Sequence, residues 1–257
     1  MEQVVAPIIS NSEVMPRVYL IWLECPQIAS QARPGQFVTM RCGEDTMLRR
    51  PLSIHQVEGN RLALLFSVVG KGTRWLSQRQ AGSKLDLLGP AGNGYVIRPD
   101  SGNLLLLAGG IGIAPLCFLA QHALKKGHAV KLLLGASTSN LLYPKHLLPS
   151  GVEVILAIED ETAGQKGMIT DPLPDYVDWA DQIFACGPVA MYQTMADGKQ
   201  KLLKGKPTQV SLEVRMGCGR GICFSCTVKT KQGLKQVCMD GPVFDLNDVL
   251  WDGLNLV

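Results

Sequence analysis

The residues best suited to chemistry are four cysteines close to the end of the chain. They follow the spacing C-x4-C-x2-C, then eleven residues, then a last cysteine: Cys218, Cys223, Cys226 and Cys238. This spacing is typical of [2Fe–2S] clusters, which need four thiolates around two irons. Gly217, Gly219 and Gly221 would let the backbone wrap closely around such a group, with N–H groups turned toward its sulfurs. The segment therefore predicts one-electron redox chemistry.

Two other uses of these cysteines are open at this point. Zinc sites usually take two paired C-x2-C knuckles, and here only Cys223 and Cys226 form one. Disulfides require an oxidising compartment, and the N-terminus lacks the charged and apolar regions of a secretory signal. The spacing favours the cluster over both. We expect the other cysteines to be small buried thiols, namely Cys25, Cys42, Cys117 and Cys186.

Composition sets broad limits on the class of protein. The 257 residues are enough for two compact domains and a small appendage. Hydrophobic residues make up 46% and charged residues 18%, so either the core is large or a partner covers apolar surface. A net charge of +3 without a long basic run gives no indication of nucleic acid binding. No apolar stretch has the length of a membrane span, and we expect a cytoplasmic protein.

Two patterns of elements must position this chemistry. Up to about residue 97 the chain has short β segments between Gly and Pro turns, such as 17–23, 35–40 and 61–69, which favours an antiparallel barrel. Apolar runs at 103–108, 130–134, 152–157 and 182–185 then alternate with helix or loop, including a helix over about 114–126. This second pattern is typical of a doubly wound α/β domain with a parallel sheet. The cluster segment begins near residue 211.

Two short motifs lie in the expected barrel. Arg50-Pro51-Leu52-Ser53 offers a cation, a hydroxyl and exposed backbone beside a stiff turn, which suits a flavin ring and its pyrophosphate. Gly70-Lys71-Gly72-Thr73 offers N–H groups for phosphate. Each could equally be a surface turn, but together in one barrel they favour flavin binding.

Two further motifs follow buried strands of the expected α/β domain. Gly109, Gly110 and Gly112 come before the helix, where backbone N–H groups could bind a dinucleotide pyrophosphate. A tight turn with close packing would need the same glycines. The tripeptide Cys186-Gly187-Pro188 would face the same crevice, with the thiol near a nicotinamide or simply in the core. The histidines, including His55, show no triad or metal spacing, and a surface position is expected for each.

The order of these motifs is similar to that of the ferredoxin–NADP reductase superfamily, in which a flavin barrel precedes a nicotinamide domain. The cysteine tail followed by Asp240-Gly241-Pro242-Val243-Phe244 resembles, more narrowly, the electron-transfer subunits of class 1B dihydroorotate dehydrogenases. The resemblance covers essentially the whole chain. It implies an FAD barrel over 1–98, a NAD domain over 99–210 and a [2Fe–2S] domain over 211–257.

The resemblance also implies roles for individual residues. The implied FAD contacts are Arg50, Pro51, Leu52, Ser53, Leu65, Phe66, Ser67, Gly72 and Thr73. The implied NAD(H) contacts are Gly109, Gly110, Gly112, Cys186, Gly187 and Pro188, and the cluster ligands are Cys218, Cys223, Cys226 and Cys238. Relatives often carry Tyr-Arg where this chain has Phe66-Ser67, so one cationic contact to FAD is missing or replaced.

The activity implied by the resemblance is a relay without a catalytic base in this chain. Electrons pass between NAD(H), FAD, the cluster and the FMN of a dihydroorotate dehydrogenase catalytic subunit, in a heterotetramer of two plus two chains that serves pyrimidine biosynthesis. Three rivals remain: a related subunit serving another partner or a ferredoxin, a self-sufficient NAD(P)H reductase, and a redox sensor without catalysis. An FAD-free purified protein would favour the sensor.

Overall fold

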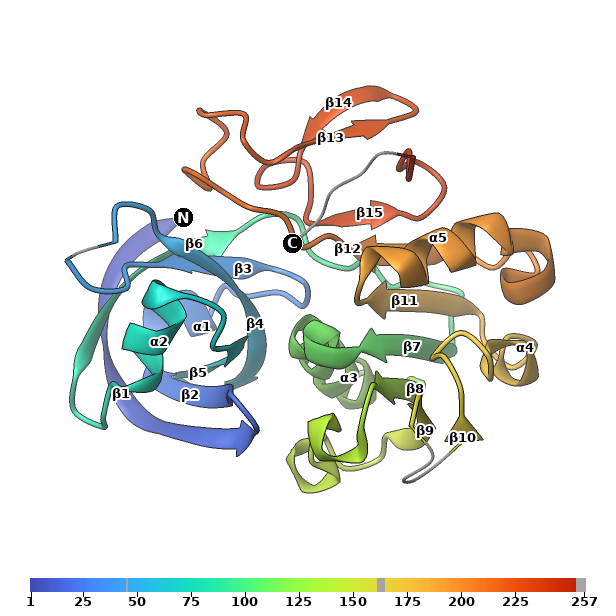
Figure 1. Ribbon diagram of the computed structural model, residues 1–257, viewed down its shortest axis with the longest axis horizontal. Coiled ribbons are helices and arrows are strands. Elements are labelled where there is room, and N and C mark those ends of the chain that lie inside the picture. Colours follow the sequence, from blue (N-terminus) through green and yellow to red (C-terminus); the bar gives the residue numbers. More distant parts are fainter. Residues whose placement is uncertain (45, 161–164, 253–257) are drawn as a thin grey trace.

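The computed structural model describes residues 1–44, 46–160 and 165–252. Figure 1 shows three parts: a closed barrel, an α/β domain beside it, and a C-terminal segment that lies across one side of both. Within the described residues, no helix combines the length and apolar character needed to cross a membrane. The antiparallel barrel and the parallel-sheet domain predicted from sequence are both present.

The barrel is formed by the first six strands, closed in the order β1-β2-β5-β4-β3-β6 with antiparallel neighbours. Their bounds are β1 Glu2–Met15, β2 Val18–Glu24, β3 Phe37–Met40, β4 Arg50–Glu58, β5 Arg61–Ser67 and β6 Lys84–Ala91. Two short helices accompany them, α1 Pro26–Ala29 and α2 Lys71–Ser77. Buried side chains from all six strands fill the interior, as the inward-facing residues of a closed barrel do.

The α/β domain has a seven-stranded sheet in the order β10-β9-β8-β7-β11-β12-β15. The strand bounds are β7 Asn103–Gly109, β8 Ala129–Ala136, β9 Glu153–Ile158, β10 Gln165–Lys166, β11 Gln182–Cys186, β12 Thr208–Ser211 and β15 Val243–Asp245. All pairs are parallel except β12 with β15. The main helices are α3 Ile113–Lys125, α4 Leu173–Tyr176 and α5 Val189–Asp197. Short turns complete it: η1 Gly110–Gly112, η2 Ser139–Leu141, η3 Lys145–Leu147 and η4 Lys199–Leu203.

The central strand β7 explains why its sequence is apolar without alternation. Leu104 and Leu106 point into the core under α3, whereas Leu105 and Leu107 point into the core on the opposite face. All four are fully buried. A parallel strand covered on both faces needs apolar residues at every position, and this run therefore fixes β7 in the middle of the sheet.

The C-terminal segment does not stand apart from the α/β domain. Its hairpin is formed by β13 Thr227–Thr230 and β14 Gly233–Gln236, and its last strand β15 extends the large sheet beside β12. Val228, Val237 and Trp251 belong to the same buried core as the sheet. The cysteine loops are therefore held on a rigid support.

Two local expectations differ from the structure. Gly70-Lys71-Gly72-Thr73 forms the first turn of helix α2 rather than an open glycine loop, because the Thr73 hydroxyl accepts hydrogen bonds from the N–H groups of Val69 and Gly70 at 3.0 and 3.1 Å. The expected surface position of His55 is wrong, since this side chain is completely buried between the barrel and α3. The four scattered cysteines are buried, as expected.

Candidate functional site

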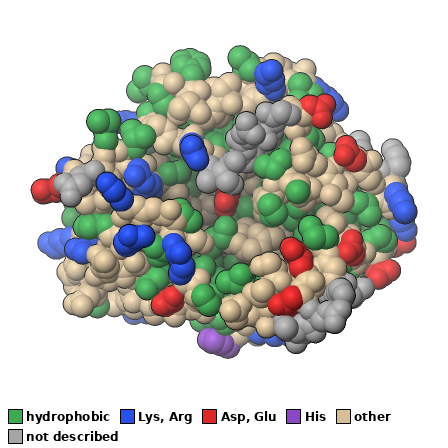
Figure 2. Space-filling model, in the orientation of Figure 1, with side chains coloured by type: hydrophobic (Ala, Val, Ile, Leu, Met, Phe, Trp, Pro, Cys, Tyr) green, Lys and Arg blue, Asp and Glu red, His purple; other side chains and the backbone are tan. Residues whose placement is uncertain are grey.

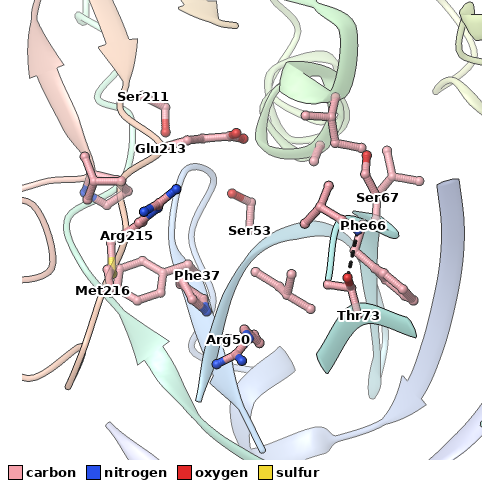
Figure 3. Close-up of a pocket in the computed structure, with 18 of the residues that line it drawn as sticks. Phe37, Arg50, Ser53, Phe66, Ser67, Thr73, Ser211, Glu213, Arg215 and Met216 are labelled. Atoms are coloured by element: carbon pink, nitrogen blue, oxygen red, sulfur yellow. Dashed lines mark hydrogen bonds between the residues drawn. The ribbon is translucent and has the colours of Figure 1, made fainter. Parts of the chain in front are cut away.

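A cavity of about 630 Å³ lies where the three parts of the molecule meet. Its walls come from barrel strands β3, β4 and β5, from the start of α3, and from the connector Ser211–Met216 that leads to the cysteines. Figure 3 shows side chains from the barrel and from the connector turned toward one space. The volume is within the range of about 300–1,000 Å³ typical of cofactor sites, and the lining is mainly apolar with a few polar groups.

The motif Arg50-Pro51-Leu52-Ser53 forms the first half of β4 and lines the cavity with all four residues. It pairs with β3, with Phe37 opposite Ser53 and Met40 opposite Arg50. The Arg50 guanidinium donates to the Leu48 carbonyl at 2.5 Å, so only part of its donor capacity is used. The neighbouring Arg49 is engaged by Asp86 at 2.7 Å. Arg50 is thus the barrel cation that remains available to an anionic ligand.

The second predicted barrel group lies on β5 and α2. Leu65, Phe66, Ser67 and Thr73 line the cavity. Gly72 is not part of the lining; it packs under Arg50, and a Cβ there would meet Arg50 Nε at 3.0 Å. Gly72 therefore gives the Arg50 side chain room, which is a supporting position behind the cavity wall.

The two predicted nicotinamide motifs lie side by side at the carboxyl ends of β7 and β11. These neighbouring strands mark the point where the strand order reverses, and ligands of doubly wound sheets bind in that crevice. A Cβ on Gly109 would meet Pro188 Cδ at 2.7 Å, and one on Gly112 would collide with the Cys186 carbonyl. Gly110 has φ +54° with open space around it, and Gly187 packs on Gly109 and Met191. Close packing alone therefore accounts for Gly109, Gly112 and Gly187.

None of these six residues lines the cavity itself. The α3 wall is formed by Ile111 and Ala114, which belong to the same loop and first turn. The turns that carry the predicted nicotinamide motifs, called the nicotinamide crevice below for the ligand predicted there, thus adjoin the cavity through α3 and the connector. A ligand at the crevice and a ligand in the cavity would be neighbours, a condition for direct hydride exchange.

The connector contributes polar residues that the sequence patterns did not reveal. Glu213 and Arg215 line the cavity, and Figure 3 shows both side chains turned toward it, with Ser53 across from them. The Cys186 thiol lies 4.0 Å from a Glu213 carboxyl oxygen. Burial raises the pKa of both groups, and the nearby Glu213 adds to the rise for Cys186. Cys186 is therefore held as a neutral thiol.

Tyr192 ties the connector to the nicotinamide crevice. Its hydroxyl accepts from the Gly187 N–H at 2.8 Å and donates to the Ser211 carbonyl at 2.7 Å. The side chain is fully buried, and burial raises the pKa of its hydroxyl well above the ordinary value. The Tyr192 hydroxyl therefore joins the turn after β11 to the start of the connector.

The cysteine loop has the backbone that its glycines predict. Gly219 and Gly221 have φ values of +64° and +78°, a region that favours glycine. The N–H groups of Arg220 and Ile222 point at Cys218 Sγ at 3.3 and 3.4 Å. The Gly221 N–H points at Cys238 Sγ at 3.3 Å. Donors already aimed at sulfur suit a site that holds anionic thiolates.

The four thiols interact in two pairs. Hydrogen bonds from Ser225, and then from Cys218, lower the pKa of Cys223 to about 6. Burial, and then the neighbouring Cys226, raise the pKa of Cys238 to about 11. Across the described ranges no three His, Cys, Asp or Glu side chains converge on one metal-ion position. In a [2Fe–2S] cluster each of the two irons takes two protein ligands. The arrangement fits a binuclear cluster.

The sequence patterns did not assign a further set of cavity-lining residues, which lie in the connector or within and beside the quoted motifs. They are Phe37, Leu48, Arg49, Val69, Ile111, Ala114, Ser211, Leu212, Glu213, Val214, Arg215, Met216 and Pro242. Only the charged pair Glu213 and Arg215, placed just before the first cluster cysteine, gave a signal that could have been noticed.

 Solved structures define the class of protein. The ferredoxin NADP+ reductase from Neisseria gonorrhoeae with bound FAD and NADP has the same fold, with a TM-score of 0.64 and 16% identity over 79% of this chain and 92% of that one. At this identity the likeness shows the fold alone. A chain in the structure of the NADH-dependent reduced ferredoxin-NADP oxidoreductase is nearer, with a TM-score of 0.87 and 30% identity over 97% of this chain and 91% of that chain. The fold and the site therefore define a protein of the ferredoxin–NADP reductase class.

Sequence relatives narrow the class to one family. Residues 213–250 match the family model described as the iron-sulfur cluster binding domain of dihydroorotate dehydrogenase B. The dihydroorotate dehydrogenase B (NAD(+)) electron transfer subunit of Desulforamulus reducens is 38% identical over 258 residues, 96% of this chain and 98% of that protein. The subunit of the same name from Geobacillus thermodenitrificans is 34% identical over 252 residues, 95% and 96% of the two chains. The chain belongs to the family of dihydroorotate dehydrogenase B electron transfer subunits.

Proposed function

We propose that this chain carries electrons between NAD(H) and the FMN of a dihydroorotate dehydrogenase catalytic subunit, through FAD and a [2Fe–2S] cluster. The observation that carries the proposal is the connector Ser211–Met216. It lines the flavin-sized cavity, its Glu213 contacts Cys186 at the nicotinamide crevice, and it ends two residues before Cys218. Three redox sites are thereby adjacent in one chain.

The residues of the cavity would hold FAD by charge and shape. FAD supplies the exchange between two-electron and one-electron chemistry, and the cluster supplies a one-electron carrier. Arg50 would bind the pyrophosphate, and Ser53 would donate to the ring. Arg215 lines the cavity and makes no hydrogen bond or ion pair with the described residues. Arg215 thus supplies a cation to the cavity. Ser67, at the position where relatives often carry Arg, supplies none.

The nicotinamide crevice would hold NAD(H) against the same cavity. Gly110 leaves open space beside the N-terminus of the 13-residue helix α3, where a pyrophosphate is favoured. The Cys186 thiol and the Glu213 carboxyl limit the space next to the cavity. Burial raises the pKa of both groups, so neither is an ordinary proton acceptor. The role of these residues is to place the nicotinamide and exclude water.

The cluster end has a surface suited to a partner protein. Large hydrophobic side chains are exposed around the cysteine loop and its hairpin: Ile222 at 74%, Phe224 at 68%, Leu234 at 70% and Met239 at 51%. In Figure 2 hydrophobic side chains gather at the top of the view, where Figure 1 places this segment. Apolar surface beside a one-electron carrier supports docking of the subunit that exchanges electrons with it.

The assembly and location follow from the same proposal. We propose a heterotetramer of two such chains and two FMN-containing catalytic subunits, acting in the cytoplasm in pyrimidine biosynthesis. We also propose the division into an FAD barrel over 1–98, a NAD domain over 99–210 and a cluster domain from 211. The pairing of β15 with β12 joins the last two parts through one sheet.

Reconstitution tests the proposal. The purified chain is combined with the FMN-containing catalytic subunit, and dihydroorotate-dependent reduction of NAD+ is measured. We expect turnover only with both chains present, and about one FAD and two irons per electron-transfer chain. Zinc in place of iron after anaerobic purification, or no turnover in an intact complex, would contradict the proposal.

A second candidate is a related reductase subunit that serves a ferredoxin. The TM-score of 0.87 with a chain of the NADH-dependent reduced ferredoxin-NADP oxidoreductase favours it over the other rivals. Reduction of a ferredoxin by the isolated chain, at a rate above that of the complex with dihydroorotate, would support this candidate.

A further inference from the structure

The buried junction between the barrel and helix α3 is the feature that the proposed function leaves unexplained. His55 is fully buried, although its ring carries two polar nitrogens. Nδ1 lies 2.9 Å from the Ala114 carbonyl oxygen, and Nε2 lies 2.8 Å from the Tyr143 hydroxyl. A carbonyl only accepts, so Nδ1 carries the proton and Tyr143 donates to Nε2. One neutral tautomer satisfies all partners.

The neighbours of His55 extend the junction along one face of the helix. Gln56 Nε2 donates to Cys117 Sγ at 3.2 Å and to the Leu147 carbonyl at 3.2 Å. The Val57 N–H donates to Gln121 Oε1 at 3.4 Å. Ala114, Cys117 and Gln121 are three and four residues apart, which puts them on one face of α3. Three consecutive strand residues thus bind three successive turns of one helix.

A local irregularity of β4 makes this possible. Successive residues of a regular strand point to opposite faces, so His55 and Gln56 would not both reach α3. The register between β4 and β5 shifts between Ile54 and Gln56, which leaves His55 as an extra residue. Such a bulge re-aims side chains, and here it turns two neighbours toward the same helix.

The residues of the junction are close in sequence to both proposed ligand sites. His55 is two residues after Ser53, at the end of the flavin motif, and Ala114 is two residues after Gly112, at the end of the glycine loop. Ala114 itself lines the cavity. A shift of α3 against β4 would therefore move the nicotinamide crevice relative to the flavin cavity.

We propose that His55 is a positioning residue that fixes α3 against β4 and thereby sets the rate of hydride exchange between nicotinamide and flavin. The inference rests on the proposed function. The step is the transfer of one hydride, a proton with two electrons, from NADH to oxidised flavin, which yields NAD+ and reduced flavin. His55 touches neither ligand, so its effect is on distance and orientation, where a displacement of about 1 Å costs roughly a hundredfold in rate.

The experiment compares His55→Phe and Tyr143→Phe with the unaltered chain. Stopped-flow reduction of the bound flavin over a range of NADH concentrations gives a limiting rate and an apparent Kd. We expect the limiting rate of His55→Phe to fall roughly ten- to a hundredfold, with FAD content and the Kd for NADH nearly unchanged. Tyr143→Phe removes one of the two hydrogen bonds and should give a smaller fall. The long-wavelength absorbance of the nicotinamide–flavin complex should weaken in the same order.

A second measurement does not depend on turnover. Hydrogen–deuterium exchange of the first turns of α3 should quicken in both variants and stay unchanged in the β13–β14 hairpin. Thr230→Val is the matched control: it removes a buried hydroxyl that donates to Gly233 at 2.8 Å, far from the junction in sequence. It should leave the limiting rate and α3 exchange unaltered.

Several outcomes would overturn the inference. A limiting rate of folded, FAD-loaded His55→Phe equal to that of the unaltered chain would do so, and so would a change confined to FAD content or to the Kd. If His55→Phe does not fold, an unchanged rate and unchanged α3 exchange in Tyr143→Phe decide against it. Failure of NADH to reduce the flavin of the unaltered chain would overturn the proposed function and this inference with it.

Discussion

The cysteine loop and the cavity proposed to hold FAD are built in different ways. The loop draws its four thiols from 21 consecutive residues, and its donors come from the backbone between them. The cavity draws its lining from segments between Phe37 and Pro242. A site made within one loop depends on spacing and glycine conformation, whereas a site made between domains depends on how those domains pack. The loop can therefore be predicted from the sequence, whereas the cavity can be predicted only in part.

Loss of one cluster thiol should have the largest effect and should separate the two regions. In Cys226→Ala only three thiolates remain, so we expect little or no cluster and a collapse of electron delivery to the catalytic subunit. Reduction of FAD by NADH should survive in part, because the barrel residues that line the cavity lie far upstream in the sequence. Iron and sulfide content and both activities are measured on one preparation. Cys25→Ala, which alters a buried barrel thiol, is the control. Near-normal coupled activity without a cluster would refute the relay.

We expect acid to destabilise the junction between β4 and α3. Burial lowers the pKa of His55 from 6.5 to about 4. The unfolded chain therefore binds a proton at higher pH than the folded chain. The contribution of neutral His55 to the unfolding free energy is complete above pH 6.5 and is lost as the pH falls toward 4. The loss amounts to about 3 kcal/mol. The groups facing His55 are the Tyr143 hydroxyl and the Ala114 carbonyl, with the Cys117 thiol beside Tyr143.

Denaturant unfolding between pH 7 and 4 measures this effect as a difference between chains. His55→Asn should show a shallower fall of the unfolding free energy than the unaltered chain. His146→Asn, which changes an exposed histidine, should keep the full slope. Equal slopes in all three chains would show that the junction does not titrate.

Removal of the available barrel cation should affect the cavity and spare the cluster. We expect Arg50→Ala to weaken FAD binding roughly ten- to a hundredfold, since a charge-assisted hydrogen bond contributes about 1.5–3 kcal/mol. Flavin fluorescence during titration of the FAD-free chain gives the affinity, and the visible spectrum reports the cluster. Arg61→Ala, at the far end of β5 and exposed, is the control. Undiminished FAD binding in Arg50→Ala would count against the flavin assignment.

A glycine substitution should give the smallest effect and test how local the cysteine loop is. Gly219 has φ +64°, and a Cβ would lie 2.8 Å from Thr39 Cγ2 of the barrel. We expect Gly219→Ala to cost about 1–2 kcal/mol from backbone conformation, plus a contribution from this contact. Gly59 has φ +57° with nothing within 4 Å, so Gly59→Ala has the backbone cost alone. Thermal unfolding compares the two, and equal losses would mean that the loop does not depend on the barrel.

Much of the fold followed from patterns that are local. Continuous apolar runs predicted β7, β8, β9 and β11, because strands covered on both faces need apolar residues throughout. The cysteine spacing predicted a cluster, and the thiols lie in two pairs. The motif at Arg50 predicted a ligand site, and its four residues line the cavity.

His55, Glu213 and Arg215 show what the sequence could not reveal. The residues next to His55 in the sequence do not indicate that its side chain is buried, because its hydrogen-bond partners are 59 and 88 residues away. The roles of Glu213 and Arg215 depend on the path of the connector between two domains. Sequence alone determined the ligands that lie within one loop and the strands that must be buried. Only the tertiary structure decided which distant segments share a cavity, because that choice depends on packing between domains rather than on local spacing.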